Sequence, residues 1–319
     1  MKIGVLGTGF GMVHLQIFQN HPLVEEVVFF SRTRSKVDEI SAKLRLQGTT
    51  NMDDILCDSS VDVVTIALPH TLHAQTAILA MEQGKDVICE VPVCPTLEEA
   101  EQVAEAARRT GRRVFVDLFD RFSTAYRFLR EKITSGEYGR LLSLQVVNRC
   151  ALVWGAVPLG LDVLPLESCS CDFDWLSWSL GELTLSGVSS IEVEQRAACI
   201  DMLLTAPGGL PIQMTCSTLM PLSYGVREHI EATFEQAAVV YQETSWNQGS
   251  DAAEMVVYNA KGAQTITLPQ ANPYYDSLTY TLERIRDGQH GITDLREAYQ
   301  AHKLALELSL NVSGTAGSL

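Results

Sequence analysis

The sequence predicts an α/β protein with an N-terminal doubly wound parallel sheet and a C-terminal α/β domain that has an open, largely antiparallel sheet. Short strand signals alternate with helix signals over the first part of the chain, which is typical of a parallel sheet covered on both faces. After about residue 122, strand signals follow one another without helices between them. A length of 319 residues accommodates two domains, which we place at 1–122 and 123–319.

The chain opens with a strand, a glycine cluster and a helix. The apolar run at 3–6 is followed by Gly7, Gly9 and Gly11, and an apolar segment of helical character comes next. A dinucleotide pyrophosphate needs this order, because the backbone must approach the phosphates and a helix N-terminus offers free N–H groups. Met12 stands at the third glycine position of Gly-x-Gly-x-x-Gly, which predicts a slightly displaced helix. The alternative is a glycine-rich turn without a ligand. We expect the cofactor to contact Gly7, Thr8, Gly9, Phe10 and Gly11.

The other elements of the first part follow in order. Strand signals occupy 24–30, 61–68, 86–90 and 113–118. Helix signals occupy 75–83, closed by Gly84, and a helix to residue 110, followed by Gly111. Thr96 and Glu99 form a capping box at the start of that helix.

The second part predicts a sheet with few helices. Strand signals lie at 141–147, 191–204, 211–219, 229–241 and 255–268. Helices are expected at 122–133, 172–180, 275–287 and 293–311. Since an open sheet leaves one broad face that needs cover, we expect a homo-oligomer, either a dimer or a tetramer.

Composition limits the class of partner. The formal net charge of −15 argues against nucleic acid and against an anionic membrane surface. No apolar run reaches membrane-spanning length, and no signal peptide is expected, which predicts a cytoplasmic protein. The eight cysteines are scattered and predict reduced thiols. Cys169 and Cys171 lack a second pair at zinc-finger spacing, so no metal is predicted.

The loop after the second strand bears on the choice of cofactor. An NAD site places a carboxylate here to accept from the ribose 2′-hydroxyl, but this chain has SRTRSK at 31–36 and no carboxylate before Asp38. Guanidinium groups would form forked hydrogen bonds with a 2′-phosphate. We therefore expect NADP(H) in preference to NAD(H), held by Ser31, Arg32 and Arg34. The alternative is a solvated basic loop.

Ordered blocks of sequence extend over nearly the whole chain. They are GTGFG at 7–11, ALPHTLHAQTAILAMEQGKDVICE at 67–90, PTLEEAEQVAEAARRTGRRVFV at 95–116, RFSTAYRFLREKITSGEYGRLLSL at 121–144, DFDWLSWSLGE at 172–182 and the end from DSLTYTLERIRDGQ. In these blocks the chain resembles the glucose–fructose oxidoreductase, inositol dehydrogenase and MocA (Gfo/Idh/MocA) family. The resemblance implies a Rossmann domain and a second domain whose sheet carries substrate contacts. It also implies hydride transfer between NAD(P) and a sugar, cyclitol or related carbonyl compound.

The resemblance assigns further cofactor contacts. It places the loop after the third buried strand beside the ribose and pyrophosphate, and Glu90 near the nicotinamide. A histidine that caps the next helix is the alternative for each of the two histidines. The loop residues concerned are Leu68, Pro69, His70 and His73.

The chain departs from the family at the groups that move protons. Glu90-Val91-Pro92 stands where most members carry Glu-Lys-Pro, and valine cannot ionise. In the motif Asp-x-Gly-x-His-x-x-Asp the chain has Glu167, Cys169, Cys171 and Asp174. We expect Cys171 and Asp174 to be the catalytic residues that supply a proton, with Glu167 as a further candidate. A small apolar filler is the alternative for Cys171.

Three functions remain open after these departures. The first is an NADP(H)-dependent oxidoreductase with a non-standard proton path, acting on a small carbonyl or imine compound. The second is a non-catalytic regulator that binds nucleotide and ligand on the same fold. The third is a glycosidase-type enzyme that retains its nicotinamide and cycles it internally. Arg121 is either a structural ion pair or a substrate contact, and Asp117 and Asp120 are expected to face solvent.

Overall fold

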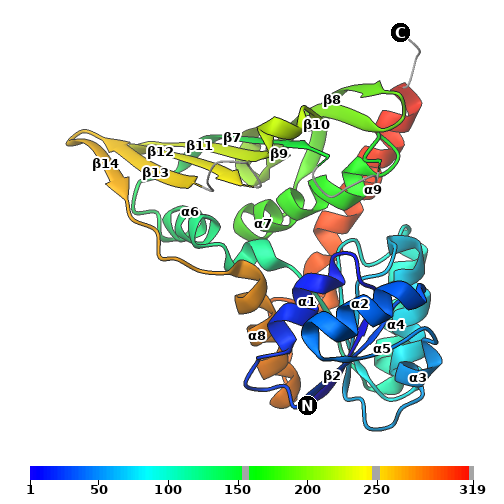
Figure 1. Ribbon diagram of the computed structural model, residues 1–319. Helices are drawn as coiled ribbons and strands as arrows, with labels where there is room; N and C mark the ends of the chain where they lie inside the picture. The colour runs from blue at the N-terminus through cyan, green and yellow to red at the C-terminus, as the bar shows by residue number, and fades with distance from the viewer. Residues whose placement is uncertain (153–157, 246–251, 316–319) are drawn as a thin grey trace. The chain divides into compact units, whose positions relative to one another are not determined.

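The structure, a computed structural model, describes residues 1–152, 158–245 and 252–315. Its chain divides into two compact units (Figure 1). Unit 1 comprises Met1–Phe119 and Asn272–Tyr299, and unit 2 comprises Asp120–Ala271 and Gln300–Leu319. The segment from Asn272 to Tyr299, which follows unit 2 in the sequence, thus belongs to unit 1.

Unit 1 contains the predicted doubly wound parallel sheet. Six parallel strands lie in the order β3-β2-β1-β4-β5-β6. The order reverses at β1, which lies between β2 and β4, and ligands of such sheets bind outside the carboxyl ends of the strands at that point. The strands are β1 (Lys2–Leu6), β2 (Glu26–Phe30), β3 (Gln47–Thr49), β4 (Val63–Ile66), β5 (Asp86–Cys89) and β6 (Val114–Val116).

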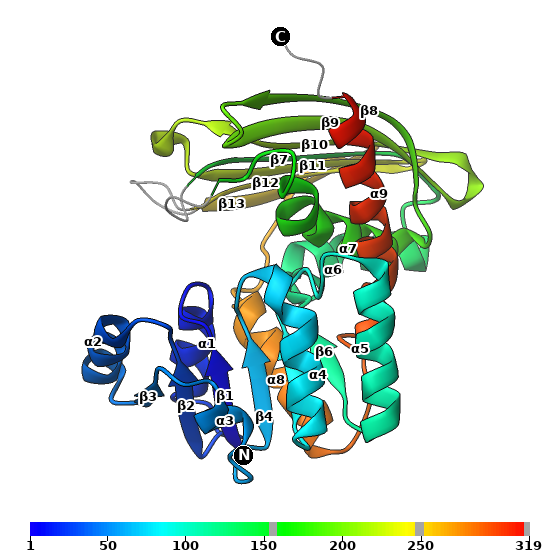
Figure 2. The same ribbon diagram turned by 90° about the vertical axis from the view of Figure 1, so that its right-hand side faces the viewer.

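Helices cover both faces of this sheet because its strands are apolar on both sides (Figure 2). One face packs against α3 (Asp53–Leu56), α4 (His73–Glu82) and α5 (Leu97–Thr110). The other packs against α1 (Gly11–Phe18), α2 (Arg34–Leu44) and α8 (Pro273–Arg286). The predicted N-cap of α5 is confirmed, since the Thr96 side chain accepts a hydrogen bond from the Glu99 backbone N–H at 3.2 Å.

Unit 2 contains the predicted open sheet, with strands in the order β14-β13-β12-β11-β7-β10-β9-β8. All neighbouring strands pair antiparallel except β7 and β10, which are parallel. The strands are β7 (Leu141–Ala151), β8 (Thr184–Val193), β9 (Ala197–Ala206), β10 (Leu210–Met220), β11 (Val226–Phe234), β12 (Ala237–Ser245), β13 (Ala252–Asn259) and β14 (Gly262–Ile266).

Three of the predicted long strands are hairpins instead. The run at 191–204 folds into β8 and β9, that at 229–241 into β11 and β12, and that at 255–268 into β13 and β14. In the first hairpin, Glu194 and Gln195 adopt left-handed φ angles of 52° and 53° without glycine. Glycine, which usually marks such a tight turn in a sequence, is therefore missing at these two positions.

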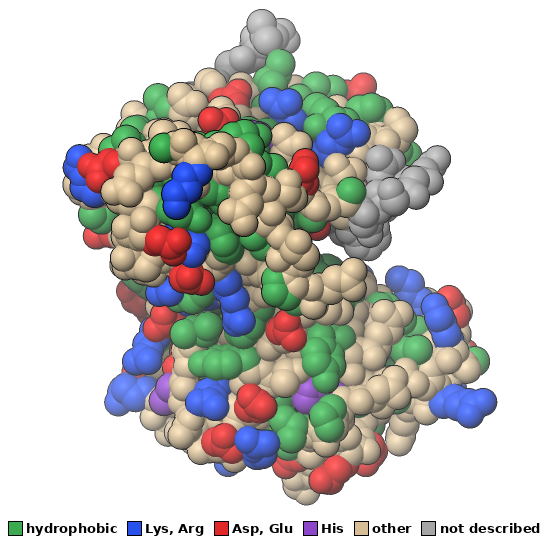
Figure 3. Space-filling view, turned by 90° about the vertical axis from the view of Figure 1, so that its left-hand side faces the viewer, with side chains coloured by type: hydrophobic (Ala, Val, Ile, Leu, Met, Phe, Trp, Pro, Cys, Tyr) green, Lys and Arg blue, Asp and Glu red, His purple; other side chains and the backbone are tan. Residues whose placement is uncertain are grey.

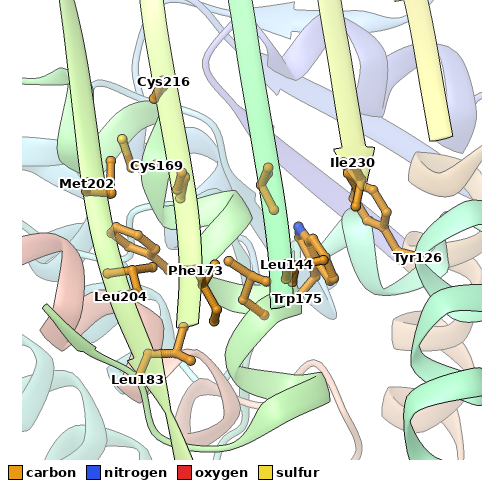
Figure 4. Packing of buried hydrophobic residues seen from close by; sticks show 14 of the residues in the cluster. Tyr126, Leu144, Cys169, Phe173, Trp175, Leu183, Met202, Leu204, Cys216 and Ile230 are labelled. Carbon is orange, nitrogen blue, oxygen red and sulfur yellow. The ribbon is translucent and has the colours of Figure 1, made fainter. Parts of the chain in front are cut away.

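One face of the unit 2 sheet carries a hydrophobic core, shown in Figure 4. It packs against α6 (Thr124–Ser135), a π-helical turn (Pro165–Cys169), α7 (Ser170–Leu180) and α9 (Tyr299–Thr315). The opposite face of β8 and β9 leaves Ile191 and Leu203 46% and 51% exposed. The sheet thus offers an uncovered, partly apolar face in the described chain.

Two surface properties bear on possible partners. On the face shown in Figure 3, cationic and anionic side chains are interspersed, and neither forms a continuous patch. Within residues 1–152, 158–245 and 252–315, no helix combines the length and apolar composition needed to cross a lipid bilayer.

Candidate functional site

The carboxyl edge of the parallel sheet gathers most of the predicted cofactor residues. Gly7 follows β1 directly, Ser31 follows β2, and Glu90 follows β5. Asp117, which follows β6, joins them at the same edge. Parallel strands end on one side of a sheet, so these residues occupy the ligand-binding edge of unit 1.

The glycine turn has the geometry that a nucleotide diphosphate requires. Gly7 has a φ of 105°, and a Cβ there would collide with the carbonyl group of Ala67. Gly9 is exposed, and a Cβ there would meet no heavy atom within 4 Å, so its backbone is open to a ligand. No side chain caps the N-terminus of α1 among the described residues. The turn therefore fits a pyrophosphate group.

The close contact between α1 and the strands falls on Gly11. A Cβ on Gly11 would lie 3.2 Å from Ala67 Cβ and 3.3 Å from Val5 Cγ1. Met12 is half-buried at the edge of the core. Gly11 thus provides the close approach of helix to strand that the third glycine of the pattern usually provides, although Met12 occupies the third position of the pattern in the sequence.

The residues predicted to select the cofactor lie on two neighbouring loops. Thr8 Oγ1 and Ser31 Oγ are 3.0 Å apart, which joins the loops after β1 and β2. Arg32 is exposed, and Arg34 begins α2 and pairs with Asp38 at 3.0 Å in solvent. Both guanidinium groups are therefore accessible to an anion.

His73 connects two loops at the same edge. Its Nδ1 lies 2.7 Å from the Pro92 carbonyl oxygen and its Nε2 lies 2.7 Å from the Leu68 carbonyl oxygen. The ring is buried, whereas Pro69 is exposed and His70 is half-buried. The His73 ring thus fixes the loops after β4 and β5, and direct cofactor contact by this histidine stays a prediction.

A buried cluster of ionisable groups lies beside these loops, and sequence reasoning missed it. His14 Nε2 lies 2.6 Å from Glu90 Oε1 and 3.3 Å from Asp117 Oδ2, although neither contact is a well-directed hydrogen bond. Nδ1 lies 2.9 Å from Thr65 Oγ1, and Ser277 on α8 donates to Asp117 at 2.7 Å. The expectation that Asp117 faces solvent is wrong, since it is 1% exposed.

The charges in this cluster stabilise a buried ion pair. Burial lowers the pKa of His14, but Glu90 and Asp117 more than reverse this and raise it to about 10. Burial raises the pKa of Glu90, and His14 only partly offsets the rise. The nearest ligand atoms of the three side chains lie within 4.8 Å of one another, and a metal ion would bind them only by displacing the imidazole proton. The imidazolium held by two carboxylates is therefore the stable arrangement.

A pH titration of stability tests this assignment. A pKa raised from 6.5 to about 10 gives stability that is fully present below pH 6.5 and lost as the pH rises through about 10. The unfolding free energy should fall over this window, with a slope approaching about 1.4 kcal/mol per pH unit. Chemical denaturation at several pH values should show that the His14→Gln variant lacks this slope. The His229→Gln variant on β11 should keep it, and an equal slope in all three proteins would exclude the charged cluster.

The predicted proton donors lie in unit 2. Asp174 is buried and accepts two hydrogen bonds from Arg121, each 2.7 Å long, which supports the ion-pair interpretation of Arg121. Cys171 is half-buried at the start of α7, Cys169 is fully buried, and Glu167 is exposed. Proton transfer by Cys171 or Asp174 stays a prediction, and the ion pair argues against Asp174 as a ready donor.

Comparison with known proteins identifies relatives of this chain. Residues 1–118 match the model of the Gfo/Idh/MocA group, described as an oxidoreductase family with an NAD-binding Rossmann fold. An uncharacterized oxidoreductase of Synechocystis sp. is 30% identical over 213 residues, which cover 63% of this chain and 57% of the relative. Inositol 2-dehydrogenase of Corynebacterium glutamicum is 27% identical over 61% of this chain and 57% of its own length. The matched region thus spans less than two thirds of these curated relatives.

A solved structure with a similar fold covers nearly the whole chain. KijD10, a 3-ketoreductase from Actinomadura kijaniata in complex with NADP and TDP-benzene, superposes with a TM-score of 0.84. The match covers 96% of this chain and 95% of that one at 18% identity. At this identity the likeness shows the fold alone.

Proposed function

The chain belongs to the Gfo/Idh/MocA family, and on that premise we propose that it is an oxidoreductase that transfers a hydride between NADP(H) and a small polar metabolite. The metabolite class is a sugar, a cyclitol, or a related carbonyl or imine compound. Relatives support the proposal, since one is named inositol 2-dehydrogenase and a structure of similar fold was solved with NADP.

One observation carries the proposal: an open glycine turn lies at the switch point of the parallel sheet. Gly7, Gly9 and Gly11 each have a separate geometric role there, in the turn, the open backbone and the helix contact. The diphosphate would be held by this backbone and by the N-terminus of α1. The nicotinamide group supplies the hydride chemistry when bound.

The preference for NADP(H) rests on the loop after β2. Arg32 and Arg34 are accessible cations in the loop that begins at Ser31, whose hydroxyl pairs with that of Thr8. A 2′-phosphate would accept forked hydrogen bonds from guanidinium groups, while a 2′-hydroxyl would gain little from them.

The proton path differs from the usual one of the family, because Val91 stands where most members carry lysine. Of the three members of the His14 cluster, Glu90 retains the most exposure, with a side chain that is 10% exposed. A carboxylate that is backed by a buried imidazolium can hold or release one proton. We therefore add Glu90 to the candidate proton-carrying residues, which also include Cys171 and Asp174.

Two further proposals concern assembly and location. We propose a homo-oligomer that buries the uncovered face of β8 and β9, where Ile191 and Leu203 are half exposed. We also propose a cytoplasmic location, which the eight free cysteines support. Size-exclusion chromatography with light scattering tests the first, and cell fractionation tests the second.

Titration of the purified protein with NADPH and NADH tests the central proposal. We expect saturable binding of NADPH, followed by a loss of reduced-nicotinamide absorbance when a matching carbonyl or imine is added. Binding without turnover over a broad panel would favour the regulator. Cofactor that stays bound through purification without net redox turnover would favour the glycosidase-type enzyme, and no binding of either nucleotide would overturn the proposal.

Replacement of one cation tests the cofactor preference. The Arg34→Ala variant should bind NADPH about 10- to 100-fold more weakly, because a charge-assisted phosphate contact is lost. Its affinity for NADH should not change. Isothermal titration calorimetry measures both affinities, and Lys43→Ala at the far end of α2 is the control with the same change of charge. An equal loss of affinity for NADPH and NADH would contradict a 2′-phosphate contact.

A further inference from the structure

The strand order of unit 1 separates the two halves of the proposed cofactor. The turn that fits the diphosphate follows β1, and the loop that carries Arg32 and Arg34 follows β2. A dinucleotide extends across the switch point of such a sheet, with one nucleotide on each side of it. Since β4 and β5 continue the sheet on the other side of β1, the nicotinamide half would bind at their carboxyl ends.

Glu90, which follows β5 directly, is the member of the His14 cluster that a bound group can contact. The side chains of His14 and Asp117 are completely buried, whereas that of Glu90 is 10% exposed. Glu90 Oε1 lies 2.6 Å from His14 Nε2 and is itself inaccessible, so the exposed part lies elsewhere on the side chain. The imidazole thus holds one carboxylate oxygen, and the remainder of the side chain borders the ligand-binding edge.

The ionisable groups that act on Glu90 come from three neighbouring elements. His14 lies on α1, Asp117 follows β6, and Cys89 precedes Glu90 on β5. Cys89 is a neutral thiol, because burial and the nearby carboxylate raise its pKa. One imidazolium is therefore shared between two carboxylates, so the fully ionised cluster has one negative charge in excess. Val91, which stands where most members of the family carry lysine, adds no cation.

Opposing effects make the charge of Glu90 sensitive to a further cation. Burial raises the pKa of its carboxyl group, His14 lowers it, and Asp117 raises it further. A cation placed beside such a carboxylate lowers its pKa, and removal of the cation raises the pKa again. The nicotinamide ring is cationic when oxidised and neutral when reduced. The protonation of Glu90 should therefore follow the redox state of a bound cofactor.

We propose that Glu90, held by His14, distinguishes the redox states of the cofactor: it is the counter-charge of the oxidised nicotinamide and takes up a proton when the nicotinamide is reduced. The inference rests on the proposed function, because it requires NADP(H) at the glycine turn. It adds a direction to that function. A carboxylate that stabilises bound NADP⁺ relative to bound NADPH makes NADPH a stronger hydride donor on the protein, which favours reduction of the substrate.

The same coupling would account for the missing lysine. In the reduction of a ketone, hydride addition to the carbon moves the C=O π pair onto oxygen, which then needs a proton. Glu90 loses its proton in the same step, since the oxidised nicotinamide that forms favours the carboxylate. One hydride and one proton are thus released together, and they balance the two hydrogens that the carbonyl group gains. Val91 is therefore compatible with reduction of a ketone.

The ratio of the dissociation constant of NADPH to that of NADP⁺ tests the inference without turnover. The two nucleotides differ only in the nicotinamide ring, so their phosphate contacts cancel in this ratio. From about pH 5.5 to about pH 8.5 the ratio should rise by at least about fivefold, because Glu90 ionises and favours NADP⁺. His14 stays protonated in this range, since burial lowers its pKa but Glu90 and Asp117 raise it to about 10. Isothermal titration calorimetry measures both constants.

Replacement of the carboxylate by an amide of the same shape assigns the effect to Glu90. In Glu90→Gln the ratio should no longer depend on pH, and near the upper end of the range it should be about tenfold lower than in the parent protein. The control Glu101→Gln, exposed on α5, has the same change of charge and should behave like the parent. If Glu90→Gln fails to fold, the pH profile of the parent protein decides alone.

The outcomes separate this inference from the proposed function. Binding of both nucleotides with a ratio that is independent of pH in the parent, or with the same pH dependence in Glu90→Gln, would overturn the inference and leave the oxidoreductase standing. Binding of neither nucleotide would overturn both. The expected ratios without turnover of any carbonyl or imine would support the inference and count against the proposed oxidoreductase.

Discussion

Gly7→Ala is expected to abolish NADPH binding and to destabilise unit 1 by about 2–4 kcal/mol. The φ of 105° is strained for any residue with a Cβ. The new methyl group would also lie 2.7 Å from the carbonyl carbon of Ala67 and closer still to its oxygen. Both atoms belong to the backbone after β4, so relief requires the loops after β1 and β4 to separate. Urea denaturation and NADPH titration measure the two effects.

Gly9→Ala separates the binding effect from the stability effect. A Cβ at this position meets no heavy atom within 4 Å, so the fold should tolerate it. The methyl group would nevertheless occupy space that a pyrophosphate needs, and NADPH affinity should fall by at least about tenfold. Undiminished NADPH affinity in Gly9→Ala would place the diphosphate elsewhere, whatever the effect of Gly7→Ala on stability.

Local signals in the sequence were enough to predict the architecture. Buried strands alternate with capped helices through unit 1, and Thr96 and Gly111 bound α5 as their chemistry predicts. The hairpins of unit 2 were missed where a turn such as Glu194–Gln195 adopts left-handed angles without glycine. The return of α8 to unit 1 was also missed, because periodicity identifies an amphipathic helix but not the sheet that it covers.

The candidate site was predictable only in part, because a sequence pattern identifies contiguous motifs but not contacts between distant segments. The glycine turn is contiguous in sequence, so its geometry follows from local chemistry. The three members of the His14 cluster, His14, Glu90 and Asp117, come from segments that lie far apart in the chain, and no spacing rule connects them. His14 lies in line with the buried Gly11 and Phe18 on one face of α1, which would have indicated a buried histidine. Its carboxylate partners become visible only when the strands are aligned.

The Arg121–Asp174 ion pair is expected to be the most sensitive side-chain interaction of unit 2. Both groups are nearly inaccessible, and the guanidinium donates two hydrogen bonds of 2.7 Å to the carboxylate. Replacement of one partner leaves the other charge buried, so Arg121→Met and Asp174→Leu should each cost about 3–5 kcal/mol. Urea denaturation measures the loss in each variant.

The double variant, which combines Arg121→Met with Asp174→Leu, separates the net contribution of the ion pair to stability from the cost of leaving one charge unpaired. With both charges removed, apolar side chains of similar size can pack together, and stability should recover to near the parent value. Arg34→Ala, which breaks an exposed pair, should leave the unfolding free energy within error. Additive losses in the double variant would mean that the two charges are stabilised independently. Recovered stability with lost turnover would show that the pair positions α7, and with it Cys171, for function.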